Sequence, residues 1–197
     1  MKNQFDNSSL KRISVKDFAY YQIKQRIIEG KLKPNQPLIE EELSAKLEIS
    51  RTPLREALQR LEFENMVIRQ SNGRLKVAPI SVQEVKEIFN VRSKLEGIAV
   101  VEATEKATED DIRTLSNIVH MIKKTYSDGN IDDILYYGSK FHSYIYDLSE
   151  NKTVNNILSQ LNDHIHRYRR LVPHQRIDRV EAEEEHQIIL NYIANKD

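Results

Sequence analysis

The stretch LIEEELSAKLEISRTPLREALQRL, residues 38–61, contains two amphipathic helical patterns joined by a short connection. The first pattern runs from about Glu40 to Leu47 and has two leucines on one face. The second begins at Arg51, after Ser50, a residue type that favours helix N-termini, and it tolerates a proline in its first turn. Its apolar residues follow the i, i+3, i+4, i+7 spacing of a buried helix face: Leu54, Ala57, Leu58 and Leu61. Two helices joined so closely are typical of a helix-turn-helix.

The flanking sequence extends this motif into a winged helix-turn-helix. An earlier helix is predicted from Asp17, because Tyr20 and two isoleucines recur at helical spacing and Gly30 follows as a stop signal. The segment LKPNQPL comes next, contains two prolines and is predicted to be a loop. Beyond the motif, the β-prone runs MVIRQ and RLKVAPI flank Ser-Asn-Gly, which is a hairpin signal. This hairpin, at residues 66–79, is the only strand signal in the chain.

From Ser81 onward the pattern is helical throughout, and it opens with a capping box formed by Ser81 and Glu84. Helices are predicted near residues 81–106, 108–127, 131–149, 152–171 and 178–195. The fold class is therefore expected to be mostly α, with an N-terminal winged helix-turn-helix (three helices plus a β-hairpin) and then an all-α helical bundle. The expected organisation is a mobile N-terminal segment, a winged domain and a helical domain, at residues 1–15, 16–80 and 81–197.

The composition excludes several classes of protein. Apolar residues make up 39% and charged residues 30% of the 197 residues, a balance typical of globular rather than disordered chains. The sequence contains neither a run long enough to span a membrane nor the apolar segment of a signal peptide, so a cytoplasmic protein is expected. The chain has no cysteine, which excludes disulfides, thiolate metal sites and cysteine nucleophiles.

The net charge of zero conceals an asymmetry between the two halves. Residues 1–80 hold 15 Lys and Arg against 10 Asp and Glu, a net charge of +5. Residues 81–197 hold 15 against 20, a net charge of −5. Such an asymmetry hints at a polyanionic partner for the basic half.

The helix that begins at Arg51 carries the residues best suited to read DNA. Arg51 and Arg55 lie off its apolar face, one turn apart at the N-terminal end, and Thr52 lies beside them. A guanidinium can pair bidentately with guanine and a helix N-terminus favours phosphate, so this end suits the major groove. On an arbitrary helix the two arginines would simply be solvated, but here the turn, the hairpin and the charge asymmetry favour DNA binding. Further contacts are expected from the hairpin tip: Asn72, Gly73 and Arg74.

Residues 19–79 resemble the DNA-binding domain of the GntR family of bacterial regulators, and the run SRTPLREAL at residues 50–58 matches its most specific motif. The second half resembles the all-helical FCD domain of the FadR-like subgroup. The residues that carry this second resemblance are VRSKLEGIAV at 91–100, Phe141-His142, Asn151 and Glu185-His186. The resemblance implies that Arg51, Thr52 and Arg55 contact DNA and that Gly73 and its neighbours form the wing contact.

One residue departs from the family pattern in the winged domain. Many members carry an arginine on the short second helix, where this chain has Glu41. Because a carboxylate repels phosphate, that contact is expected to be lost or redirected.

The resemblance also raises the question of a metal, because many FCD domains hold a divalent ion with one Asp and three His. His142 and His186 match two of these ligands, but Gly138 occupies the Asp position. The family continues into one more helix with the last His, and this sequence ends at Asp197, before that helix. Two interpretations of His142 and His186 therefore stay open. They form an incomplete zinc or nickel site, or they are histidines of the cavity that are hydrogen-bonded or bind a ligand directly. Three other histidines could be recruited to such a site: His164, His166 and His174.

The helical domain is expected to bind a small anionic effector through Arg92, His142 and His186, because its cavity lacks the acidic ligand. Arg92 and Glu96 lie one turn apart, so Arg92 could instead form an intrahelical ion pair. Two tyrosines before His142, Tyr136 and Tyr137, are expected either to line the same space or to belong to the core.

These features predict a ligand-responsive transcription regulator, not an enzyme, that binds a pseudo-palindromic operator as a homodimer. One alternative is a partner-binding module whose winged domain no longer reads DNA. A second alternative is a metal-dependent hydrolase that uses His142 and His186. The sequence identifies neither the operator nor the effector. Whether the protein represses or activates transcription depends on the position of the operator.

Overall fold

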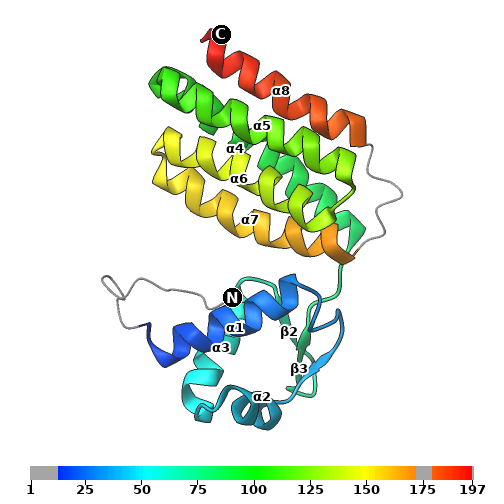
Figure 1. Cartoon of the computed structure of the whole chain (residues 1–197). Helices are drawn as coiled ribbons and strands as arrows, with labels where there is room; N and C mark the ends of the chain where they lie inside the picture. The colour runs from blue at the N-terminus through cyan, green and yellow to red at the C-terminus, as the bar shows by residue number, and fades with distance from the viewer. Residues whose placement is uncertain (1–12, 172–178, 197) are drawn as a thin grey trace, which may run out of the picture. The chain divides into compact units, whose positions relative to one another are not determined.

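The structure is a computed structural model that describes residues 13–171 and 179–196. It divides into two compact units, residues 1–80 and residues 81–197, and each unit is described by itself (Figure 1). Most of the predicted N-terminal segment, residues 1–12, lies outside the described residues. Within the described ranges, no helix is long and apolar enough to cross a membrane. The predicted fold class, a winged helix-turn-helix followed by a helical bundle, is confirmed.

The first unit begins with α1 (Val15–Ile28), which starts two residues earlier than predicted. The reason is Ser14, whose hydroxyl caps the helix by accepting a hydrogen bond from the backbone N–H of Asp17 at 3.2 Å. The residues after Ser14 therefore belong to the winged domain and not to the N-terminal segment. The helix ends where predicted, since Gly30 adopts a φ of 72°, a conformation that favours glycine.

The two helices of the central motif are α2 (Glu40–Leu47) and α3 (Arg51–Phe63). Ser50 is the N-cap residue of α3, as predicted, and has the extended conformation of a cap residue, although its side chain makes no capping hydrogen bond. The turn is tightened by Glu48, which adopts the left-handed conformation, with φ 55°. The predicted apolar face is buried in one core with residues from α1 and the strands: Tyr20, Ile23, Ile27, Leu54, Ala57, Leu58, Leu61, Met66, Val67 and Val77.

Three strands form the wing: β1 (Pro37–Leu38), β2 (Val67–Arg69) and β3 (Leu75–Val77). All pairs are antiparallel and the order is β1-β3-β2. The hairpin of β2 and β3 was predicted, but β1 corrects the prediction that its segment is a loop. Periodicity cannot reveal a two-residue strand, and Pro37 is tolerated because β1 lies at the edge of the sheet.

The second unit contains five helices within the described residues: α4 (Val82–Lys106), α5 (Glu109–Asp128), α6 (Ile131–Ser149), α7 (Lys152–Leu171) and α8 (Arg179–Asn195). Ser81 caps α4 by accepting a hydrogen bond from the N–H of Glu84. The reciprocal capping box predicted there is found at α5, between Thr108 and Asp111. Figure 1 shows α4, α5, α6 and α8 running side by side as a bundle, with α7 against α4 and α6.

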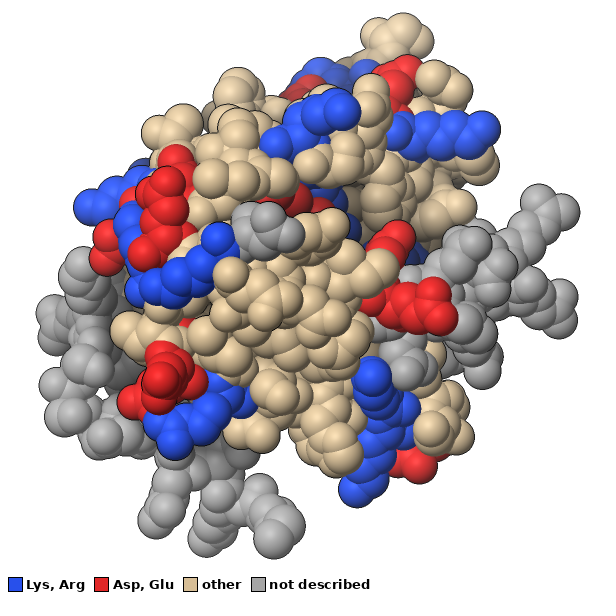
Figure 2. Space-filling view, turned by 90° about the horizontal axis from the view of Figure 1, so that it is seen from above, with Lys and Arg blue, Asp and Glu red and all other residues tan. Residues whose placement is uncertain are grey.

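The core of the second unit has two apolar clusters that α4 shares. One cluster joins α4, α5, α6 and α8 around Phe141 and Leu115. The other joins α4, α6 and α7 around Ala99 and Leu158. On the face shown in Figure 2, uncharged residues form a broad central area, and basic and acidic side chains are interspersed around it. This face shows no large patch of one sign.

Candidate functional site

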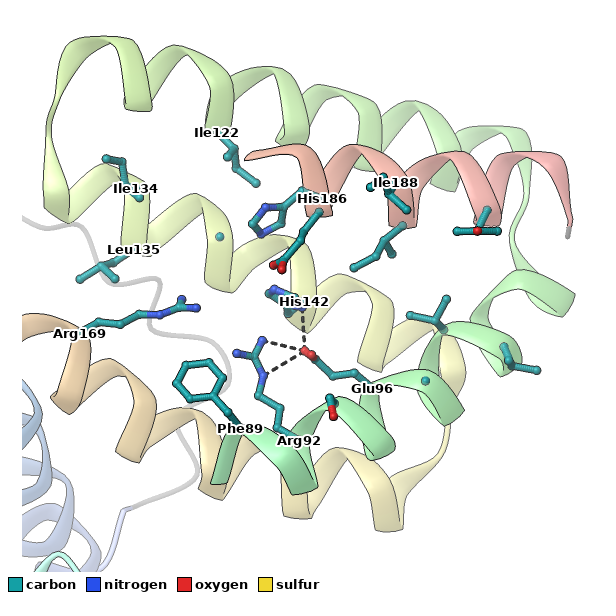
Figure 3. A pocket seen from close by; sticks show the side chains of 18 of the residues that line it. Phe89, Arg92, Glu96, Ile122, Ile134, Leu135, His142, Arg169, His186 and Ile188 are labelled. Carbon is teal, nitrogen blue, oxygen red and sulfur yellow. Dashed lines mark hydrogen bonds and ion pairs between the residues drawn. The ribbon is translucent and has the colours of Figure 1, made fainter. Parts of the chain in front are cut away.

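A cavity of about 690 Å³ lies inside the second unit and is lined by all five of its described helices. Most of its lining is apolar, as expected of a small-molecule site. Figure 3 shows its charged and polar side chains converging from α4, α6, α7 and α8. The acidic and basic side chains among the lining residues are Arg92, Glu96, His142, Arg169, Glu185 and His186.

Glu96 is the centre of the polar network in this cavity. One of its oxygens, Oε1, accepts hydrogen bonds from Nη2 and Nε of Arg92 at 2.7 and 3.1 Å and from the hydroxyl of Tyr146 at 2.5 Å. The same oxygen lies 2.8 Å from Nδ1 of His142. Burial alone would raise the pKa of Glu96, but His142, Arg92 and Tyr146 outweigh burial and lower it to about 2. Glu96 is therefore ionised and holds three side chains from two helices in fixed orientations.

Burial lowers the pKa of His142, although Glu96 opposes this effect. A neutral imidazole that donates its Nδ1 proton to Glu96 carries its lone pair on Nε2. His142 thus has the tautomer needed to accept a hydrogen bond or to ligate a metal. The ring of His186 lies beside it, with 5.2 Å between the ring centroids, and this side chain is only 8% exposed.

The residues of the cavity do not fit a divalent metal. A Cβ atom at Gly138 would lie 3.9 Å from Nε2 of His186, so this position faces the histidines, but glycine provides no ligand. The bonded oxygen of Glu96 already faces four donor atoms from three side chains, one of them the cationic Arg92. In the part of the chain that the structure describes, no group of three or more His, Asp or Glu side chains could hold a metal ion. Two imidazoles beside a guanidinium make a poor site for a dication.

The other histidines proposed as ligands do not complete the site. His166 makes a 2.7 Å hydrogen bond with Ser139, and neither His164 nor His166 lines the cavity. His174 lies outside the described residues.

Arg92 forms the ion pair with Glu96 that the sequence suggested, but this pair is buried and not on the surface, since Arg92 is only 5% exposed. Of the two alternatives for the tyrosines, the cavity is wrong for both, and the core is confirmed for Tyr137 alone. Tyr136 is 58% exposed, and Tyr137 packs against the core. Sequence reasoning missed Arg169, which lines the cavity from α7. The only signal was the basic run at the end of that helix, which does not indicate which side chain points inward.

The predicted DNA contacts lie on exposed surface. Arg51 and Arg55, at the start of α3, are 56% and 60% exposed at their side chains. Both pair with the acidic start of α2: Nε of Arg55 lies 2.8 Å from Oε2 of Glu40. Nη2 of Arg51 lies 3.6 Å from Oε2 of Glu41. Glu41 therefore contacts Arg51, a side chain predicted to contact DNA. The sequence predicts that Glu41 causes a phosphate contact of α2 to be lost or redirected, and this ion pair involves the same carboxylate.

At the tip of the hairpin, Asn72, Gly73 and Arg74 are all exposed. The backbone N–H of Arg74 donates to the side-chain oxygen of Asn72 at 3.0 Å, and Gly73 has a φ of 80°. Arg69 donates to the carbonyl oxygen of Gly73. These bonds hold the tip in a tight turn and leave the side chain of Arg74 accessible.

Comparison with protein families matches both units of the chain. Residues 15–77 match the family described as "Bacterial regulatory proteins, gntR family". Residues 87–197, more than half of the chain, match the FCD domain.

Individual relatives carry the same type of description. The chain is 30% identical over 148 residues to an uncharacterized HTH-type transcriptional regulator, YdhC of Bacillus subtilis, covering 75% of this chain and 66% of YdhC. It is 28% identical to the HTH-type transcriptional regulator McbR of Escherichia coli, covering 77% of this chain and 69% of McbR. A solved structure of E. coli McbR/YncC aligns over 94% of this chain and 88% of that chain, with a TM-score of 0.74 and 25% identity. The gluconate operon transcriptional repressor of Bacillus licheniformis is 31% identical, covering 63% of this chain and 51% of the repressor. The match thus spans about two thirds of YdhC and about half of the gluconate repressor.

Proposed function

The chain belongs to the GntR family of DNA-binding transcriptional regulators, in the subgroup with an FCD domain, and from this premise we propose how it acts. It binds a pseudo-palindromic operator as a homodimer, and a small carboxylate in the helical domain modulates the affinity for DNA. The relatives are transcriptional regulators and not enzymes, so the chemistry proposed is binding without turnover.

The exposed first turn of α3 is the observation that supports sequence-specific DNA binding. Arg51, Thr52 and Arg55 project from a helix whose opposite face is buried, so the N-terminal end is available to enter the major groove. The exposed turn of the hairpin provides a second contact to the DNA backbone.

The cavity supports the effector part of the proposal. It is lined by residues of all five described helices, which belong to both apolar clusters of the unit, so a ligand inside it would lie between these helices. A ligand that prefers one arrangement of these helices would shift the population of DNA-binding conformations. Zinc or nickel on His142 and His186 is the alternative occupant from the sequence, and the described residues of the cavity do not fit it.

The operator proposal is tested by selecting the preferred duplex from a random pool and measuring its mobility shift. We expect a two-fold symmetric consensus and an affinity that falls steeply with salt, because phosphate contacts release counterions. A protein that selects no sequence, and whose affinity is the same for all duplexes, would contradict DNA reading and favour the partner-binding alternative.

The homodimer is supported by apolar side chains that α4 leaves on the surface of the isolated chain. Val91 and Ile98 are 50% and 45% exposed and lie two turns apart on one face of this helix. A second copy packed on this face would remove both from water. We expect light scattering to give twice the 23.1 kDa chain mass at tens of micromolar, and I98D to shift the mass toward the monomer.

A matched control for this prediction is I157D, which changes an isoleucine that is 42% exposed on α7. This variant should remain dimeric. A wild-type protein that is monomeric at tens of micromolar without DNA would refute the dimer, and an I98D variant that stays fully dimeric would refute this face.

A further inference from the structure

One arginine links α3 to the turn of the wing. Arg69, the last residue of β2, makes a forked contact with Glu62 in the last turn of α3. Its Nε donates to Oε1 of Glu62 at 3.1 Å, and its Nη2 donates to Oε2 at 2.8 Å. The remaining nitrogen, Nη1, donates to the carbonyl oxygen of Gly73 at 3.2 Å. A single side chain therefore joins α3 to the residues that turn from β2 to β3.

The other hydrogen bonds of the turn act only within it. The N–H of Gly73 donates to the carbonyl oxygen of Gln70, and the N–H of Gln70 donates to that of Arg74. The N–H of Arg74 donates to the side chain of Asn72. These bonds fix the shape of the turn but not its distance from α3. Among the described residues, no side chain of the hairpin other than Arg69 forms a hydrogen bond or ion pair with α3.

The base of the hairpin is held by apolar packing, which does not reach the turn. Val67 and Val77 are buried in the core together with Leu61. Residues 70–74 are all exposed. Because a two-stranded ribbon is only marginally stable in water, such a turn would sample many positions without a link near its tip. Ordering it on DNA would then cost affinity.

The same contacts leave Arg69 poorly suited to contact DNA itself. Its three nitrogens already donate to protein acceptors, and the carboxylate of Glu62 neutralises its charge. The two side chains are 45% and 29% exposed, so their ion pair adds little to the stability of the fold. A bidentate pair nevertheless fixes the direction of both side chains. Its main contribution is therefore to geometry.

We propose that Arg69 is a positioning residue of the DNA interface. It holds the turn of the wing at a fixed distance from α3, so that Arg74 contacts the DNA backbone while Arg55 reads a base. This assignment rests on the proposed function, because it names a residue that supports operator binding without touching DNA.

The test measures operator affinity, by mobility shift with the full chain, in two variants whose charges change in opposite directions. E62Q removes a negative charge from the DNA-binding unit, whereas R69Q removes a positive one. Attraction to phosphate alone would strengthen binding by E62Q and weaken binding by R69Q. Positioning predicts that both variants bind the selected operator about 3- to 10-fold more weakly, because both release the turn from α3.

Two further variants serve as controls. E56Q removes another exposed carboxylate from α3, one that pairs with Lys16 of α1 at 3.1 Å and not with the hairpin. It should bind the operator at least as tightly as the wild type. R69K keeps the charge but not the forked geometry, so it should bind more weakly than the wild type. The melting temperatures of E62Q and R69Q should change by only a few degrees, because the pair is exposed.

A double-mutant cycle shows whether Arg69 acts through the wing. R74A removes the proposed contact of the wing with the DNA backbone. In this background R69Q should weaken operator binding by less than about 2-fold, because the turn no longer has a contact to position. An arginine with a merely structural role would give the same factor with and without Arg74.

Three results would overturn the inference. These are an E62Q variant that binds the operator as tightly as E56Q, an R69K variant that binds like the wild type, and an R69Q factor that is the same with and without Arg74.

The operator selection separates this inference from the proposed function. If the wild type selects a symmetric operator and R55A weakens its binding, any of these three results refutes only the role of Arg69. A wild type that selects no operator refutes both.

Discussion

Replacement of Arg55 by alanine is expected to weaken binding to the selected operator by ~1–3 kcal/mol, or about 5- to 150-fold, and to relax the preference at one base pair in each half-site. The reason is the position of Arg55, one turn into α3 and 60% exposed, from which a guanidinium can reach the edge of a guanine. Mobility shifts on the consensus duplex and on duplexes changed at single positions would measure both effects.

Two variants sharpen this prediction. R113A removes an equally charged, exposed side chain from the other unit and should leave operator affinity unchanged. E40Q removes the carboxylate that pairs with Arg55 at 2.8 Å, so we expect tighter binding, because Arg55 no longer exchanges an ion pair for its DNA contact. If R55A behaves like R113A, α3 does not read the operator.

The largest effect on stability is expected from Glu96. Its replacement by alanine would leave Arg92, His142 and Tyr146 without their shared acceptor inside the helical unit. Breaking a buried pair by removing one partner destabilises a protein by about 3–5 kcal/mol, because the remaining charge stays buried. Urea unfolding followed by circular dichroism should therefore show the loss in the transition of the helical unit.

The same carboxylate makes this stability depend on acid. The pKa of Glu96 is lowered from 4.5 to about 2 in the folded protein, which corresponds to roughly 3 kcal/mol. A depressed folded-state pKa contributes stability above the unfolded value, and the contribution is lost as the pH falls from about 4.5 toward 2. The wild type should lose this stability over that window, whereas E96Q should lack this part of the acid dependence.

E105A is the matched control, because Glu105 is exposed on the same helix. It should change the free energy of unfolding by less than about 0.5 kcal/mol. An E96A variant as stable as E105A would show that the hydrogen bonds to Glu96 contribute little.

Local patterns predicted most of the fold correctly. The spacing of Leu54, Ala57, Leu58 and Leu61 identified the buried face of α3, and all four are in the core. The five helices of the second unit were predicted to within one residue of their observed bounds. Both results have one cause: helical periodicity and capping are encoded by residues a few positions apart.

The errors concern interactions between distant residues. The strand β1 depends on pairing between Pro37–Leu38 and Leu75–Val77, which nothing near Pro37 announces. Tyr136 was expected either in the cavity or in the core, and it lies on the outer surface of α6. A pattern along one helix gives the apolar face but not the neighbours that cover it.

The sequence by itself determined the two-domain organisation proposed here, the helices, the family resemblance and the exposed arginines of α3, because each of these follows from local patterns. Only the tertiary structure decided how the cavity is charged. Arg92, Glu96 and Arg169 have similar sequence surroundings, rich in charged residues, yet Arg92 and Glu96 form a close buried ion pair, whereas Arg169 lines the same cavity from another helix together with Glu185. Electrostatic balance depends on distances between helices and on exclusion from water, and both are fixed only when the helices pack.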